Sequence, residues 1–129
     1  MAGKKHDEAF VALVDASRSR IEEVTVEDVL AMQAAAEVFH FVDVREDREF
    51  AVDSCAGAIH IGKGVLERDI AKHVDDVGAR IVLYCGGGYR SALAAESLQR
   101  MGYMNVASMD GGIRAWRGAS GPLQTPEAV

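Results

Sequence analysis

The chain has 129 residues, 49% of them hydrophobic and 26% charged, which suits one globular domain with its own core. Its formal net charge of −6 argues against partners such as nucleic acids and anionic membrane surfaces, which bind basic proteins. The first eight residues are polar, and no segment is apolar enough for a signal sequence or a membrane span. We therefore expect a cytoplasmic protein with no nucleic-acid or membrane partner.

The N-terminal part of the chain predicts two helices separated by a short strand. Apolar residues at helical spacing predict an amphipathic helix over residues 7–20. Residues 22–24 fit a short edge strand. Thr25 and Asp28 have the spacing of a capping box, which predicts a helix over residues 26–36.

The next segment, residues 38–45, is typical of a buried parallel strand with a charged C-terminal end. Residues that follow strand C-termini line the ligand crevice of open α/β sheets, so Asp43 and Arg45 are candidate functional residues. The structural alternative is that they form a buried ion pair or cap the helix that follows.

The rest of the chain alternates between strands and helices, which predicts a parallel α/β sheet. We expect one or two helical turns over 46–52, a turn over 53–57, strands over 58–61, 81–84 and 104–109, and helices over 65–74 and 92–101. Gly102 should end the second of these helices. A glycine loop over 110–112 then precedes a helical turn with Trp116 as a core residue, and a tail begins at Gly121.

The strongest functional signal is a strand, a tight loop and a helix with a thiol at the junction. Cys85 follows the strand directly, and the loop continues through Gly86, Gly87, Gly88, Tyr89 and Arg90. Such a loop brings several N–H groups together beside the positive end of a helix dipole. We expect a reactive thiolate at Cys85, the alternative being an inert buried thiol. The four scattered histidines and two isolated cysteines predict neither a metal site nor a disulfide framework.

The spacing between Cys85 and Arg90 bears on what this loop could bind. Three possibilities are sulfur transfer through a cysteine persulfide, phosphate or arsenate chemistry, and an interaction module without chemistry. Four residues separate Cys85 from Arg90 here, whereas cysteine phosphatases have five, in the pattern C-x5-R. The shorter loop should form a smaller cradle, suited to one additional sulfur atom. Glycines keep that cradle free of β-carbons and reach positive φ at little cost.

Four segments, in order along residues 22–118, resemble the motifs of single-domain rhodaneses, the thiosulfate sulfurtransferase family. They are the loop 84–91, the segment 41–46 followed by Glu49 and Phe50, the strand 57–61, and the closing segment 109–116. The resemblance implies a rhodanese-like α/β domain with a five-stranded, mainly parallel sheet flanked by helices on both faces. We expect an N-terminal helical extension (1–21) before it and a C-terminal tail (119–129) after it.

The resemblance also implies an activity that needs no metal and no organic cofactor. Cys85 would take a sulfane sulfur from a small-molecule donor and pass it to cyanide or to a thiol acceptor, protein thiols included. The amides of residues 86–90 would bind the substrate, and Arg90 would also close the loop. Asp43 and Arg45 would support the loop from below.

Some alternatives stay open at this point. The loop interior contains no lysine or arginine, so the donor could be thiosulfate or a persulfide or polysulfide. The domain could also be a sulfur carrier or regulatory module without turnover, while loop length disfavours arsenate or phosphate chemistry. Cys55 could be a resolving thiol for Cys85 or a small buried residue.

Overall fold

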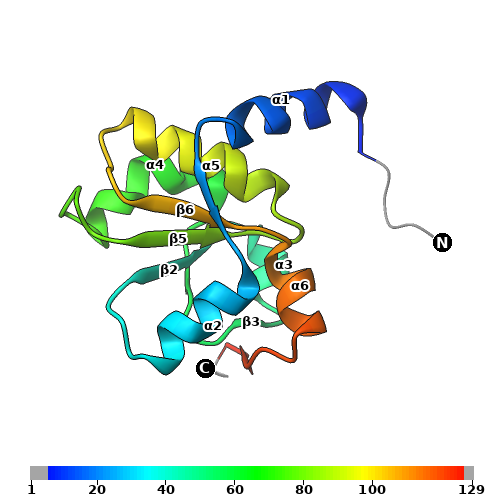
Figure 1. The fold of residues 1–129 in the computed structure, drawn as a ribbon, viewed down its shortest axis with the longest axis vertical. Coiled ribbons are helices and arrows are strands. Elements are labelled where there is room, and N and C mark those ends of the chain that lie inside the picture. The colour runs from blue at the N-terminus through cyan, green and yellow to red at the C-terminus, as the bar shows by residue number, and fades with distance from the viewer. Residues whose placement is uncertain (1–5, 127–129) are drawn as a thin grey trace.

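A five-stranded parallel sheet divides the structure into two layers of helices (Figure 1). The computed structural model describes residues 6–126. All neighbouring strands of the sheet are parallel. In spatial order the strands are β1 (Glu22–Val24), β6 (Val106–Met109), β5 (Ile81–Tyr84), β2 (His40–Asp43) and β4 (Ile59–His60). The α/β fold predicted from the sequence is confirmed.

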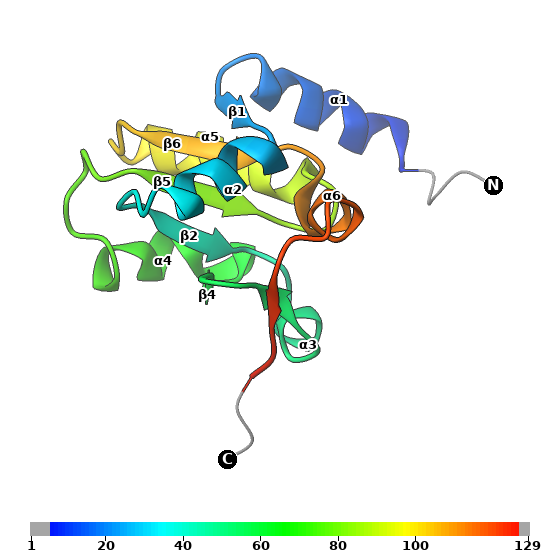
Figure 2. The same cartoon turned by 60° about the horizontal axis from the view of Figure 1, so that its bottom comes forward.

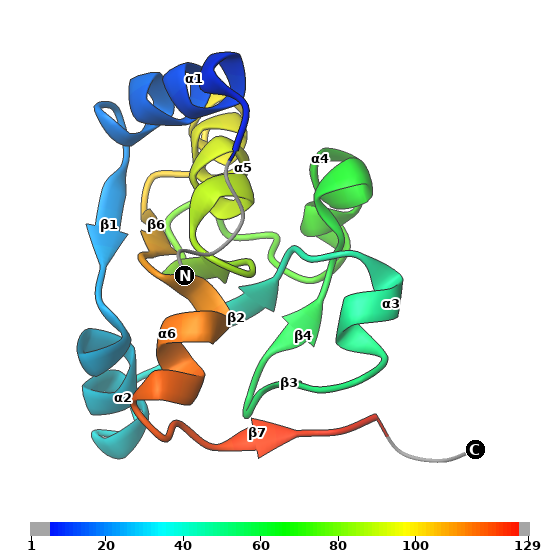
Figure 3. The ribbon, with the colours of Figure 1, turned by 90° about the vertical axis from the view of Figure 1, so that its right-hand side faces the viewer.

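Helices cover both faces of this sheet, as Figures 1 and 3 show. One face carries α1 (Glu8–Arg18), α4 (Leu66–Asp69) and α5 (Tyr89–Arg100). The other carries α2 (Val26–Ala34) and α6 (Gly112–Gly118), and the short α3 (Asp47–Phe50) lies near β4. Within residues 6–126, no helix combines the length and the apolar character that crossing a membrane would require.

The pleat of the central strands decides which side chains face which helix layer. Successive side chains of a strand point to opposite faces of the sheet. Val42, Leu83 and Cys85 therefore belong to the core cluster beneath α4 and α5. Tyr84 belongs to the opposite cluster, beneath α2 and α6, which also contains Cys55. The two cysteines consequently lie on opposite sides of the sheet.

Local signals set the ends of several helices. Thr25 and Asp28 form the predicted capping box of α2. Gly102, at φ +105°, follows the end of α5 as expected. The beginning of α5 differs from the prediction, because Gly88 at φ +94° allows the chain to enter the helix three residues early. Tyr89 and Arg90 thus belong to the first turn of α5.

Two other elements differ from the sequence-based expectations. The turn expected at 53–57 contains β3 (Ser54–Cys55), which pairs antiparallel with β7 (Leu123–Gln124) in the segment expected to be a tail. Both strands are labelled in Figure 3, and β7 is the red arrow in Figure 2. Trp116, a buried core residue as predicted, donates its indole N–H to the Pro122 carbonyl at 2.8 Å. Residues 121–124 are therefore attached to the domain, while 127–129 lie outside the described residues.

The helix expected over 65–74 is broken into the 3₁₀ turn η1 (Lys63–Val65), α4 and the 3₁₀ turn η2 (Ile70–Lys72). Its apolar spacing was nevertheless informative, since Leu66, Ile70 and Val74 are all buried in the core beneath α5. The spacing of four residues predicted the buried face of this segment, and packing against the sheet tightened its turns.

Candidate active site

Cys85 stands where β5 ends and the chain turns into α5, at the carboxyl edge of the parallel sheet. This edge is where open α/β sheets bind their ligands. The Cys85 residue is only 1% exposed. Its Sγ atom accepts the backbone N–H of Gly88 at 3.2 Å and of Ser91 at 3.4 Å. Two N–H donors directed at one sulfur stabilise negative charge on it.

Other N–H groups of the same loop have no hydrogen-bond partner in the described residues. The amides of Gly86, Gly87, Tyr89 and Arg90 donate to no acceptor among residues 6–126. They come from the loop and from the first turn of α5, where helix geometry leaves N–H groups unsatisfied. Unpaired N–H groups in a loop of this kind are potential donors to an anion, so binding of substrate by residues 86–90 stays a prediction.

Two buried hydroxyl groups lie behind the thiol. The Ser91 Oγ atom is 3.5 Å from the Cys85 Sγ atom and 2.8 Å from the Ser108 Oγ atom. Ser91 and Ser108 are both fully buried. Because the two hydroxyls are hydrogen-bonded to each other, burying them costs little free energy. The pair also gives the Cys85 sulfur a polar neighbour on α5.

The segment that precedes and opens α6 holds the loop from the other side. The N–H groups of Ile113 and Arg114 donate to the carbonyls of Cys85 at 2.9 Å and Gly86 at 3.1 Å. Gly112, at φ +55°, makes this approach possible, because a β-carbon there would overlap the Cys85 carbonyl oxygen. The carbonyls of Cys85 and Gly86 are thereby bound to the first turn of α6.

Arg90 is fixed by an acid that the sequence did not single out. Its guanidinium donates to the two carboxylate oxygens of Glu49 at 2.7 and 3.2 Å, and it lies against Gly86. The bond with Arg90 lowers the pKa of Glu49 to about 2. This geometry suits a residue that closes the loop and spans from α5 to α3.

The Glu49–Arg90 pair should make stability depend on pH in the acid range. The folded-state pKa of Glu49 lies below its usual value of 4.5, so the contribution is present above pH ~4.5 and is lost as pH falls towards 2. Because about a third of each side chain is exposed (30% and 34%), screening limits the effect to about 1 kcal/mol or less. The free energy of unfolding, measured by urea titration at each pH between 2 and 6, should therefore change less with pH in Glu49→Gln than in the wild type. The same weaker pH dependence is expected in Arg90→Gln. A pH dependence like that of the wild type in both variants would contradict the pairing.

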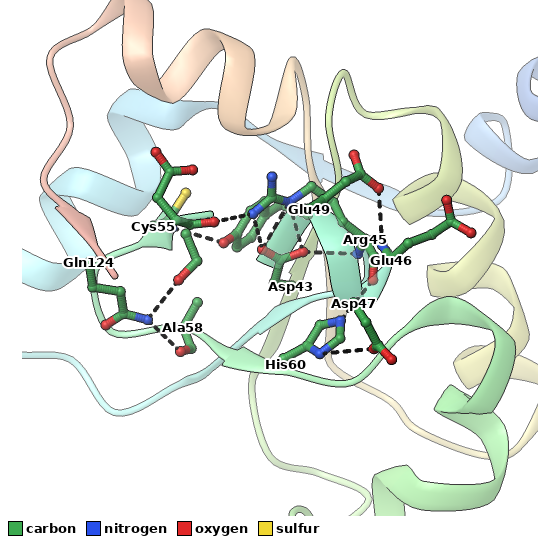
Figure 4. A network of polar contacts seen from close by, with 12 residues as sticks. Asp43, Arg45, Glu46, Asp47, Glu49, Cys55, Ala58, His60 and Gln124 are labelled. Carbon is green, nitrogen blue, oxygen red and sulfur yellow. Dashed lines mark hydrogen bonds and ion pairs between the residues drawn. The ribbon is translucent and has the colours of Figure 1, made fainter. Parts of the chain in front are cut away.

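Asp43 and Arg45 form a buried ion pair (Figure 4). The Arg45 guanidinium donates to the Asp43 carboxylate at 2.8–3.1 Å and to the Asp53 carbonyl at 2.6 Å. Both residues therefore connect β2 to the chain before β3, in agreement with the structural alternative from the sequence. Support of the loop by this pair stays a prediction, since the direct partner of a loop residue is Glu49.

The Tyr89 ring faces the N-terminal helix. It stacks on Phe10 at 5.9 Å between ring centroids and lies 4.4 Å from His6, while the Arg18 guanidinium sits 5.0 Å from its centre. Cation–π and stacking contacts of this kind stabilise exposed aromatic rings. The first turn of α5 is therefore attached to α1 through Tyr89.

The arrangement matches a known family along most of the chain. The sequence profile described as "Rhodanese-like domain" matches residues 25–119. The chain belongs to the rhodanese-like family. A thiosulfate sulfurtransferase GlpE of Ectopseudomonas mendocina is 34% identical to it over 86 residues, which are 67% of this chain and 76% of that protein.

Two further proteins resemble this rhodanese-like domain. A Bacillus subtilis protein named as a candidate sulfur carrier, YrkF, is 29% identical over 100 residues, and the chain covers only 53% of its length. A solved structure from Rhodopseudomonas palustris, of unknown function and titled a candidate tyrosine phosphatase, is 32% identical. It covers 96% of this chain and all of its own, with a TM-score of 0.78.

Sequence reasoning found the thiol and the loop of the rhodanese-like domain but missed several neighbours of that loop. They are Glu49, Ser91, Ser108, Gly112 and Arg114. The segments that resembled family motifs contained Glu49, Ser91, Gly112 and Arg114, so motif membership was an available signal for these four. Ser108 lies within a strand and carries no comparable signal.

A cavity of about 870 Å³ adjoins the loop after Cys85 at Arg90. Its other lining residues come from the end of β2, the start of α3 and the η1 region, and they include Arg48 and Lys63. Cys85 is not among them. Arg90 is therefore the loop residue that borders this cavity.

Cys55 is an unsuitable partner for Cys85 in the rhodanese-like domain. It is fully buried in the opposite core cluster, and burial raises the pKa of its thiol to about 12. Both thiols are buried, but the Cys85 sulfur accepts two loop N–H groups at a strand end whereas Cys55 lies in the core, so we expect iodoacetamide at pH 8 to alkylate Cys85 much faster than Cys55 in the folded protein. Peptide mass spectrometry would locate the label, with urea-unfolded protein, labelled on both thiols, as the control. Comparable labelling of both cysteines in the folded state would reopen a redox role for Cys55.

Proposed function

We propose that this rhodanese-like protein is a sulfurtransferase that carries a sulfane sulfur as a persulfide on Cys85. The observation that carries the proposal is the convergence of the Gly88 and Ser91 amides on Sγ, with further unpartnered amides beside it. A terminal persulfide sulfur is a small anion, and N–H donors close to Cys85 would stabilise one.

The reaction would proceed by two displacements. The Cys85 thiolate attacks the outer sulfur of a donor such as thiosulfate or a persulfide. A new S–S bond forms, the donor's own bond to that sulfur breaks, and the leaving group departs with the electron pair. An acceptor, cyanide or a thiol, then attacks the outer sulfur of Cys85–S–S⁻ and regenerates the thiolate. The cavity beside Arg90 offers room for an acceptor larger than cyanide.

Intact mass spectrometry tests this proposal directly. After incubation with thiosulfate, the protein should gain the mass of one sulfur atom on Cys85, and cyanide should remove it as thiocyanate. Polysulfide and an alkane thiosulfonate serve as further donors. Failure to form an adduct with all three donors would overturn the proposal.

The similarity to the candidate carrier YrkF favours a second reading, in which Cys85 is loaded but turnover is incidental. Steady-state rates with cyanide and with thiol acceptors separate the two, because a carrier would load quickly and turn over slowly with every acceptor. We expect no hydrolysis of an aryl phosphate, since the Cys85–Arg90 spacing is one residue shorter than in cysteine phosphatases.

A further inference from the structure

Three arginines from different elements lie against the three glycines of the loop. Measured from the position of an ideal β-carbon, Gly86 is 3.1 Å from Arg90 Nη2, Gly87 is 3.4 Å from Arg114 Nη1, and Gly88 is 3.6 Å from Arg18 Nη2. The arginines belong to α5, α6 and α1 respectively. A loop with no cation in its own interior is therefore bordered by three guanidinium groups.

One of these guanidinium groups is hydrogen-bonded to a carboxylate, and a second lies within ion-pair distance of two carboxylates without a hydrogen bond to either. Arg90 is paired with Glu49 at 2.7 Å. Arg18 lies 3.4 Å from Glu23 and 3.9 Å from Asp110. By contrast, in the part of the chain that the structure describes, Arg114 has no carboxylate oxygen within 4.0 Å of its guanidinium nitrogens.

Arg114 is also fixed in place relative to the loop. Its own backbone N–H donates to the Gly86 carbonyl at 3.1 Å, so its backbone is bound directly to the loop. Its side chain is solvent-exposed while its guanidinium lies next to Gly87. A charged group that is both uncompensated and adjacent to the loop attracts anions more than one already paired.

We propose that Arg114 binds the anionic part of the sulfur donor and makes this protein selective for dianionic donors such as thiosulfate. The inference rests on the proposed sulfur-transfer function and adds a substrate-binding residue to it. In the first displacement the Cys85 thiolate and thiosulfate carry three negative charges together, and the products, Cys85–S–S⁻ and sulfite, carry the same three. Arg114 offsets the repulsion between thiolate and donor, and it stabilises the sulfite as it leaves.

The test compares two donors that deliver the same sulfur with different charge. Persulfide formation on Cys85 is followed with thiosulfate, a dianion, and with methanethiosulfonate, a monoanion, over a range of concentrations and ionic strengths. Because the Coulomb energy scales with charge, Arg114→Gln should lower the second-order rate constant about 10-fold for thiosulfate and about 3-fold for methanethiosulfonate. For thiosulfate the loss should appear mainly as a higher concentration needed for half-maximal rate, with the maximal rate little changed. The salt dependence of the rate should also decrease.

Two variants complete the design. Arg114→Lys should recover most of the thiosulfate rate, because it restores the charge. Arg117→Gln removes the same charge from the same helix, but Arg117 is paired with Asp53, so its rates should match the wild type. Equal losses with both donors, or no loss with thiosulfate, would overturn the role of Arg114. These outcomes differ from failure of the proposed function, in which the wild type itself forms no persulfide with any donor.

Discussion

Replacing Cys85 with serine is expected to lower sulfur-transfer turnover by at least ~10³-fold, because an alkoxide or hydroxyl cannot form the persulfide. The fold should survive, since a hydroxyl is no larger than a thiol and Ser91 Oγ offers it a hydrogen-bond partner within the buried site. Thiocyanate production measures the activity, and urea unfolding measures the stability. We expect the free energy of unfolding to change by no more than about 1 kcal/mol.

The matched control for this variant is Cys55→Ala, which removes the other free thiol. It should retain persulfide formation, because Cys55 lies on the opposite face of the sheet. Residual turnover in Cys85→Ser above a few per cent of wild type would rule out a Cys85 persulfide. Loss of the sulfur adduct in Cys55→Ala with an intact fold would implicate the second thiol.

The second large effect is expected from Gly112→Ala. A β-carbon at this position would overlap the Cys85 carbonyl oxygen and lie 2.7 Å from the Gly86 carbonyl oxygen, at a φ of +55°. The strained φ costs about 1 kcal/mol and the loss of two hydrogen bonds from α6 about 1–3 kcal/mol. We therefore expect a destabilisation of about 2–4 kcal/mol, together with a loss of at least ~10-fold in the rate of persulfide formation as the loop amides lose their alignment.

Gly118→Ala provides the control for that experiment, since it lies in the same helix and a β-carbon there meets no atom within 4 Å. It should leave both stability and persulfide formation close to wild type. Urea unfolding and the rate of Cys85 loading together distinguish a local effect on the loop from general weakening of α6. Wild-type behaviour of Gly112→Ala in both assays would show that the loop is not held through its carbonyls.

The sequence predicted the parts of the fold that depend on local signals. The capping box at Thr25 predicted the start of α2, and Gly102 predicted the end of α5, because each acts through its immediate neighbours. The β3–β7 ribbon was missed because each strand has only two residues, too few for a hydrophobic period. Its partners come from segments about 70 residues apart, so only tertiary structure brings them together.

The candidate site shows the same division. Cys85 and the glycines were evident because strand, loop and helix follow each other directly in the sequence. The positive charge around the loop was not evident from the sequence, because Arg114 and Arg18 reach the loop from α6 and α1. Judged by its sequence, the loop has a neutral interior, whereas the folded loop has guanidinium groups beside it. The placement of these arginines depends on how α1 and α6 pack beside the loop, which no single sequence motif encodes.

The strand order has a consequence for how the protein reaches its native state. Glu22 of β1 lies opposite Ala107 of β6, so the first strand of the sheet must wait for one of the last segments to be synthesised. Pairings between such distant residues slow folding, since a long chain must close before any contact forms. The same late segment leads into the N–H groups that orient the Cys85 loop. During synthesis, a chain that has already formed β5 and α5 would thus carry the thiol with its loop still unsupported. We therefore expect the loop to reach its final form only after β6 and the start of α6 have joined the sheet.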